Sequence, residues 1–92
     1  MSISVKKTDG NRYTVTVSDG RGETQHRVTV QPAFAQKLTA GRIATDELVQ
    51  RSFEFLLQRE PKEDILPEFD LAVIGRYFPE FESEIRKRIQ PN

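Results

Sequence analysis

Residues 12–18 have the sequence RYTVTVS, in which apolar and polar side chains alternate. This period of two is typical of a strand with one buried face, and β-branched valine and threonine favour that conformation. The same alternation recurs in residues 3–7 (ISVKK) and 24–30 (TQHRVTV). Because residues typical of turns separate the three segments, residues 1–31 predict a three-stranded antiparallel β-meander.

The two turns of this meander set its expected register. A three-residue first turn would place Val5 opposite Tyr13, and a four-residue second turn would place Val15 opposite Val28. Opposed residues of an antiparallel pair share a face, so both registers collect the apolar side chains on one face. That face is predicted to contain Ile3, Val5, Tyr13, Val15, Val17, Val28 and Val30, with His26 near its edge.

Beyond residue 31, the apolar residues follow helical spacing instead. The longest helix is expected to run from Thr45, as its N-cap, to Glu60, just before Pro61. Shorter helical segments are expected after Pro32, Pro61, Asp70 and Pro79. The predicted fold is therefore α+β, with a three-stranded antiparallel β-meander followed by three to four helices that pack on one sheet face. We expect a single domain over 1–92, comprising the meander (1–31) and a helical half (32–92).

Length and composition narrow the classes of function. A chain of 92 residues has a shallow core, so a surface site or a partner interface is expected rather than a large internal cavity. Cysteine is absent, which excludes a disulfide scaffold, a thiol nucleophile and a thiolate metal site. Basic and acidic residues balance at 14 each, without the excess typical of nucleic-acid binding. No segment has the pattern of a signal peptide or membrane span, so a cytoplasmic protein is expected.

Two stretches of the helical half resemble a known group of sequences. One runs from residues 36–39 (QKLT) through 52–61 (SFEFLLQREP), and the other is 69–80 (FDLAVIGRYFPE). Together with the β-rich N-terminus, they resemble a group of small bacterial proteins of no assigned function. The resemblance implies a bacterial cytoplasmic protein and assigns no role to any residue.

No catalytic constellation is apparent, so we predict that the protein is not an enzyme and has no catalytic, cofactor-binding or metal-ligating residue. His26 is the only histidine, and it is interpreted as a sheet-edge side chain with a partly exposed ring. Gly20 and Gly22 lie between two strands, which favours a hairpin turn over a phosphate-binding loop. The carboxylates between Glu60 and Asp70 are interpreted as caps and solubilising charge.

The helical half is rich in aromatic rings for its size. Phe55, Phe69, Tyr77 and Phe81, together with Phe78, either complete the core over the sheet or form an exposed patch. Exposed rings of this kind favour a protein partner or a second copy of the chain. The first functional prediction is therefore a non-enzymatic protein-interaction module that binds a partner or self-associates through these residues.

The polar face of the sheet carries the alternative prediction. Lys6, Arg12 and Arg27 project from this face and would suit an anion or a nucleic acid, as would the basic helix end at residues 86–88. Nucleic-acid-binding sheets usually add exposed aromatic rings for base stacking, and Tyr13 is expected on the buried side. A nucleic-acid-associated regulator is therefore the second hypothesis, and nucleic acid is the less favoured partner. No membrane partner and no cofactor are expected.

Overall fold

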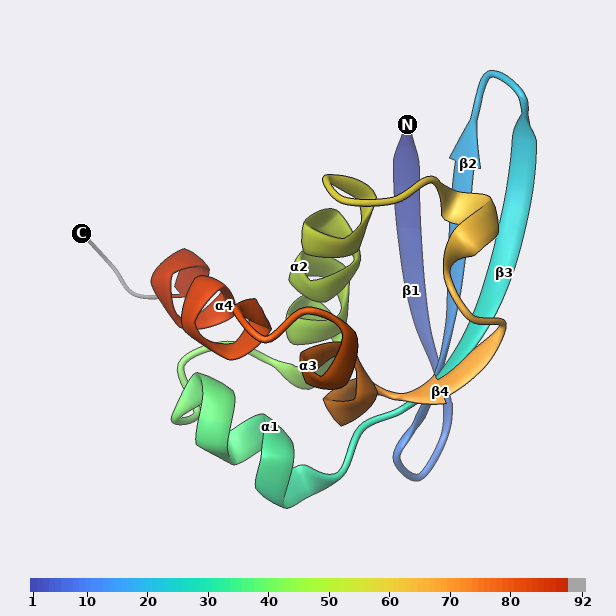
Figure 1. The fold of residues 1–92 in the computed structure, drawn as a ribbon. Coiled ribbons are helices and arrows are strands. Elements are labelled where there is room, and N and C mark those ends of the chain that lie inside the picture. The colour runs from blue at the N-terminus through green and yellow to red at the C-terminus, as the bar shows by residue number, and fades with distance from the viewer. Residues whose placement is uncertain (90–92) are drawn as a thin grey trace.

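The computed structural model describes residues 1–89, and Figure 1 shows a sheet with helices α1–α4 on one side of it. Helix α2 lies against the sheet, while α1 and α4 pack together and against α2. The elements include two single 3₁₀ turns, η1 and η2. In chain order they are β1 (Ser2–Asp9), β2 (Arg12–Asp19), β3 (Gly22–Thr29), α1 (Pro32–Thr39), α2 (Thr45–Leu57), η1 (Lys62–Asp64), β4 (Glu68–Asp70), η2 (Leu71–Val73), α3 (Ile74–Tyr77) and α4 (Phe81–Ile89).

The sheet has four strands in the order β1-β2-β3-β4. The first three are antiparallel, as predicted, but β4 pairs parallel with β3, aligning Val28 with Phe69. The α+β class is therefore confirmed, and the expectation of a purely antiparallel three-stranded sheet is wrong. A strand of three residues is too short to show a recognisable alternation. The chain also reaches the free edge of β3 only after a long crossover through α1 and α2, as a parallel pair requires.

The first hairpin pairs Val5 with Val15 rather than with Tyr13. Its turn contains only Gly10 and Asn11, and an irregularity in β1 just before the turn absorbs the extra residue. Gly10 has a positive φ of 41°, a conformation that glycine adopts without strain. The predicted register is therefore wrong by two positions along the strand.

The second hairpin pairs Val15 with His26 instead of Val28, because its turn contains only Gly20 and Arg21. A shift of two positions leaves every side chain on its predicted face, since the strand period is also two. Both the buried and the half-buried members of the predicted apolar face are where the sequence places them. The buried ones are Tyr13, Val15, Val17, Val28 and Val30, and the half-buried ones are Ile3 and Val5.

Helix α2 covers the apolar face of the sheet. The fully buried ring of Phe53 lies 5.4 Å from the ring of His26 and 6.0 Å from that of Phe69. Leu48 and Val49, one turn earlier, are also fully buried. The helical spacing of these apolar residues therefore builds the layer of core between helix and sheet.

The ends of α2 differ from the prediction. Thr45 is the first helical residue and Ala44 occupies the N-cap position, so the predicted Thr45 cap is wrong. The helix ends at Leu57 rather than at Glu60, because the N–H of Arg59 bonds to a carbonyl only three residues back, at 2.9 Å. Such bonds tighten the final turn and end the regular helix. Within residues 1–89, none of the helices is long and apolar enough to cross a lipid bilayer.

Candidate functional site

Two of the four aromatic residues predicted for an interaction surface are part of the core. Phe55 and Phe81 are fully buried, with ring centres 5.2 Å apart, and Phe78 meets Phe55 edge-on at 6.0 Å. The guanidinium of Arg59 lies 3.6 Å from the centre of the Phe55 ring. These rings are buried because α4 covers the side of α2 that faces away from the sheet. The core interpretation therefore holds for Phe55 and Phe81.

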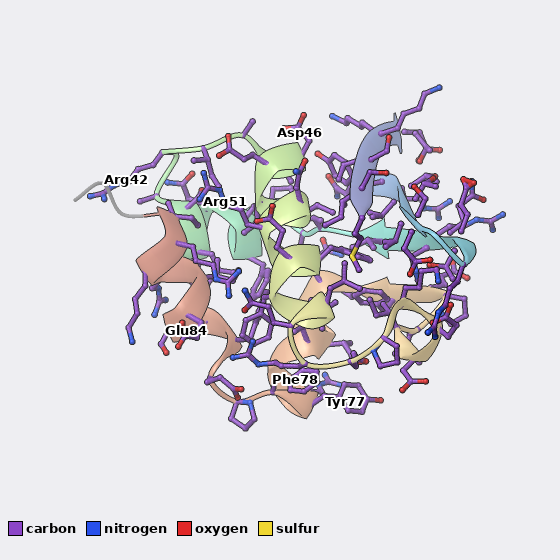
Figure 2. All side chains as sticks on the ribbon, turned by 90° about the horizontal axis from the view of Figure 1, so that it is seen from above. Arg42, Asp46, Arg51, Tyr77, Phe78 and Glu84 are labelled. Atoms are coloured by element: carbon purple, nitrogen blue, oxygen red, sulfur yellow. The ribbon has the colours of Figure 1, made fainter. Side chains whose placement is uncertain are left out.

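The other two aromatic residues, Phe69 and Tyr77, line a common groove. Phe69 is half-buried beside the core, whereas 65% of Tyr77 is exposed. Figure 2 shows Tyr77 at the outer margin of the molecule, next to Phe78. We call this depression the Tyr77 groove.

The Tyr77 groove is open to solvent, has a volume of about 190 Å³ and is lined mainly by apolar side chains. Leu56 comes from α2, Leu66 from the segment before β4, and Ile74 from α3. The lining residues come from the segment that runs from the end of α2 through η1 and β4 to α3, whose path Figure 1 shows. Leu66 is 42% exposed, so it and Tyr77 present apolar surface to solvent at the same groove. The remaining apolar lining is formed by Ile65, Phe69, Val73 and Phe78.

His26 holds one wall of the groove to the sheet. It is 2% exposed, and its Nδ1 lies 2.8 Å from the carbonyl oxygen of Leu66. Since a carbonyl only accepts, Nδ1 donates to it, and Nε2 forms a hydrogen bond with the Thr24 hydroxyl at 2.9 Å, as the acceptor when the ring is neutral. The prediction of a partly exposed edge histidine is therefore wrong. The two-residue hairpin turn moves His26 inward, opposite Val15 and against Phe53.

Lys62 links η1 to the end of β2 beside the β2–β3 turn. No role for this residue was predicted from the sequence. Its side chain is only 3% exposed, and Nζ donates to the carboxylates of Glu63 and Asp19, the latter at 3.0 Å. These hydrogen bonds, led by the one to Glu63, raise the pKa of Lys62. No local pattern distinguishes Lys62 from the exposed charges around it, because Asp19 is 43 residues away in sequence.

Two carboxylates complete the lining of the Tyr77 groove. Glu60 follows the end of α2, and Asp64 ends η1. Burial, and secondarily the negative charge of Asp64, raises the pKa of Glu60 above its ordinary value. Asp70 acts as a cap, as predicted, since its Oδ1 accepts the N–H of Ala72 at 3.0 Å. Glu60 and Asp64 instead place negative charge beside an apolar surface.

The polar sheet face keeps its predicted residues but is not uniformly basic. Lys6, Arg12 and Arg27 are all exposed. Glu68 aligns with Arg27 in the parallel pair, so its carboxylate shares this face, and Asp70 lies two positions further along β4. The edge strand β4 therefore places carboxylates beside Arg27, which weakens the attraction of this face for a polyanion.

Two of the basic side chains at the end of α4 already have partners within the chain. Arg86 lies 3.9 Å from Glu82, and Arg88 donates to the side-chain oxygen of Gln58. The turn containing Gly20 joins two strands rather than a strand and a helix, in agreement with the hairpin interpretation. In the described part of the chain, no group of three or more His, Cys, Asp and Glu side chains could hold a metal ion.

Comparison with known proteins identifies no family for this chain. The chain matches no protein-family model, no curated protein and no solved structure. Its function is therefore inferred from the side chains that the fold brings together. The Tyr77 groove is the candidate site, because it combines exposed apolar residues with two carboxylates.

Proposed function

We propose that this protein is a non-enzymatic protein-interaction module that receives an apolar side chain of a partner protein in the Tyr77 groove. The observation that carries the proposal is the exposure of Leu66 and Tyr77 around an apolar depression. Scattered exposed apolar residues are ordinary, but a contiguous group beside a concave apolar surface is typical of a binding site. Covering a Leu or Phe side chain of a partner there would contribute about 1.5–3 kcal/mol.

The size of the groove suits one anchoring side chain. Its volume of about 190 Å³ exceeds the roughly 150 Å³ of an apolar cavity that accepts benzene. A Leu, Met or Phe side chain of a partner therefore fits, with the rest of the partner lying over Leu66 and Tyr77. Interfaces of this kind depend on a few buried anchors surrounded by contacts that exclude water.

Selection from a random peptide library on the immobilised protein tests the proposal. Tyr77→Ser removes the exposed ring, and Tyr77→Phe is the matched control that keeps the ring and loses only the hydroxyl. Because Tyr77 is exposed, both variants should fold, which circular dichroism checks. Selected peptides should share an apolar residue, bind Tyr77→Phe as they bind the natural protein, and bind Tyr77→Ser about tenfold more weakly.

Peptides that bind Tyr77→Ser undiminished would contradict the proposal, as would a library that yields no enriched sequence. Self-association is a separate outcome. Sedimentation would then give a dimer mass for the natural chain and a monomer mass for Tyr77→Ser. That result would make a second copy of this chain the occupant of the groove.

The nucleic-acid alternative has less support. It requires a basic surface, and the sheet face around Lys6, Arg12 and Arg27 includes Glu68. An Arg12→Gln/Arg27→Gln variant separates the two proposals. It should bind the selected peptides normally, whereas a nucleic-acid regulator would lose salt-dependent binding to DNA or RNA.

A further inference from the structure

The carboxylates of the Tyr77 groove are not neutralised by the chain itself. Within residues 1–89, no basic side chain forms an ion pair with Glu60 or Asp64. The nearest basic residues in sequence are engaged elsewhere. Arg59 pairs with Glu80 at 3.0 Å, and Lys62 pairs with carboxylates outside the groove. The groove therefore combines an apolar floor with two negative charges that have no partner among the described residues.

This combination determines which occupant fits. A neutral apolar group would remove more water from the already partly buried Glu60 carboxylate, which costs free energy. An anionic group would be repelled by Glu60 and Asp64, which already repel each other. A group that brings a positive charge would offset both effects, because the partly buried Glu60 carboxylate gains a charge-assisted hydrogen-bond donor and the exposed Asp64 adds attraction.

We propose that the Tyr77 groove selects partner segments that contain an apolar side chain and, within one helical turn of it, a lysine or arginine. The groove binds the apolar side chain, and Glu60 and Asp64 pair with the positive charge. This inference rests on the proposed function and names the chemistry of the partner. The occupant is a polypeptide rather than a small amine, because Leu66 and Tyr77 line the groove yet stay 42% and 65% exposed, which leaves apolar surface for residues that flank the anchoring side chain. Complementary charge at such an interface chiefly sets specificity and association rate.

Three synthetic peptides test the inference. They share one sequence with a single Leu, and differ only at the position one helical turn later, which is Lys, Gln or Glu. Binding is followed by NMR titration of the ¹⁵N-labelled protein. The Lys peptide should bind about fivefold more tightly than the Gln peptide, in the upper range for an exposed ion pair, and the Glu peptide should bind most weakly. The differences should shrink in ~0.5 M NaCl.

Two variants locate the effect. Glu60→Gln/Asp64→Asn should bind the Lys and Gln peptides equally. Glu68→Gln, which also removes a carboxylate but lies on the polar sheet face, should keep the preference. Equal affinities of the natural protein for all three peptides, with shifts at the groove, would overturn the charge preference and leave the proposed function standing.

Absence of shifts around Tyr77 with every peptide would overturn both the inference and the proposed function. n-Octylammonium, titrated in parallel, distinguishes the source of the cation. It should bind more weakly than the Lys peptide, because it lacks the flanking residues with which a peptide would cover the exposed parts of Leu66 and Tyr77. If it binds as tightly, the occupant is a small amphiphilic amine and the polypeptide proposal is wrong.

Discussion

Replacing His26 with leucine should lower the free energy of unfolding by about 2 kcal/mol. The substitution removes the hydrogen bonds to the Leu66 carbonyl and the Thr24 hydroxyl, at 2.8 and 2.9 Å. A polar group left unpaired in the interior costs about 1–3 kcal/mol. Both partners are only partly buried and can regain some contact with water, so about 1 kcal/mol each is expected. Leucine keeps much of the apolar contact with Phe53.

Urea unfolding followed by far-UV circular dichroism measures this change, since the chain lacks tryptophan. The expected loss corresponds to a fall of about 8–16 °C in Tm. His26→Asn is the matched control, because its amide nitrogen occupies nearly the same place as Nδ1 and can donate to the Leu66 carbonyl. It should recover about half of the loss. A His26→Leu protein within about 0.5 kcal/mol of the natural one would refute the reasoning, since that is the range of a substitution without structural consequence.

Three further predictions concern the core and the charged groups. Phe81→Ala should cost about 3–5 kcal/mol in urea unfolding, because the ring is fully buried between helices, and a loss below about 1 kcal/mol would contradict its place in the core. Glu60→Gln should raise the free energy of unfolding at neutral pH. The raised pKa of Glu60 means that the folded state binds the carboxyl proton more tightly than the unfolded state, so the stability of the natural protein falls as pH rises through that pKa. The stability gained by the substitution should therefore vanish below the ordinary pKa of glutamate. Equal gains at pH 3 and pH 7 would contradict this assignment. The hydrogen bond from Lys62 lowers the pKa of Glu63, and the stability that this ion pair contributes is lost as pH falls. The free energy of unfolding of Lys62→Met should therefore decrease less between neutral and acid pH than that of the natural protein. An unchanged pH profile would argue against the ion pair.

The faces of the sheet were predictable from sequence, whereas its exact pairing was not. The period of two assigns Val15 and Val17 to the buried face whatever the turn lengths, provided that any shift is even. The alternation alone does not reveal that each turn contains two residues. That difference moves His26 from the margin to the interior, where it acquires its contacts with the Leu66 segment.

The groove was only partly predictable for a related reason. Aromatic content pointed to the right half of the chain, but sequence does not show which faces of a helix are covered. Helix α4 covers Phe55, while 65% of Tyr77 stays exposed. The carboxylates Glu60 and Asp64 look like solubilising charges in sequence. Their position beside Leu66 depends on how η1 and β4 fold back on α2.

Photo-crosslinking from position 77 tests the central claim most directly. Tyr77 is replaced with p-benzoylphenylalanine in the full chain, cells producing it are irradiated, and the crosslinked peptide is sequenced by mass spectrometry. The same probe at Gln25, an exposed position on the polar sheet face, is the control. The prediction is a partner segment with an apolar residue close to Lys or Arg, crosslinked from position 77 alone and in lower yield in the Glu60→Gln/Asp64→Asn background. Identical adducts from both positions, or none from position 77, would contradict the assignment of the Tyr77 groove as the interaction site.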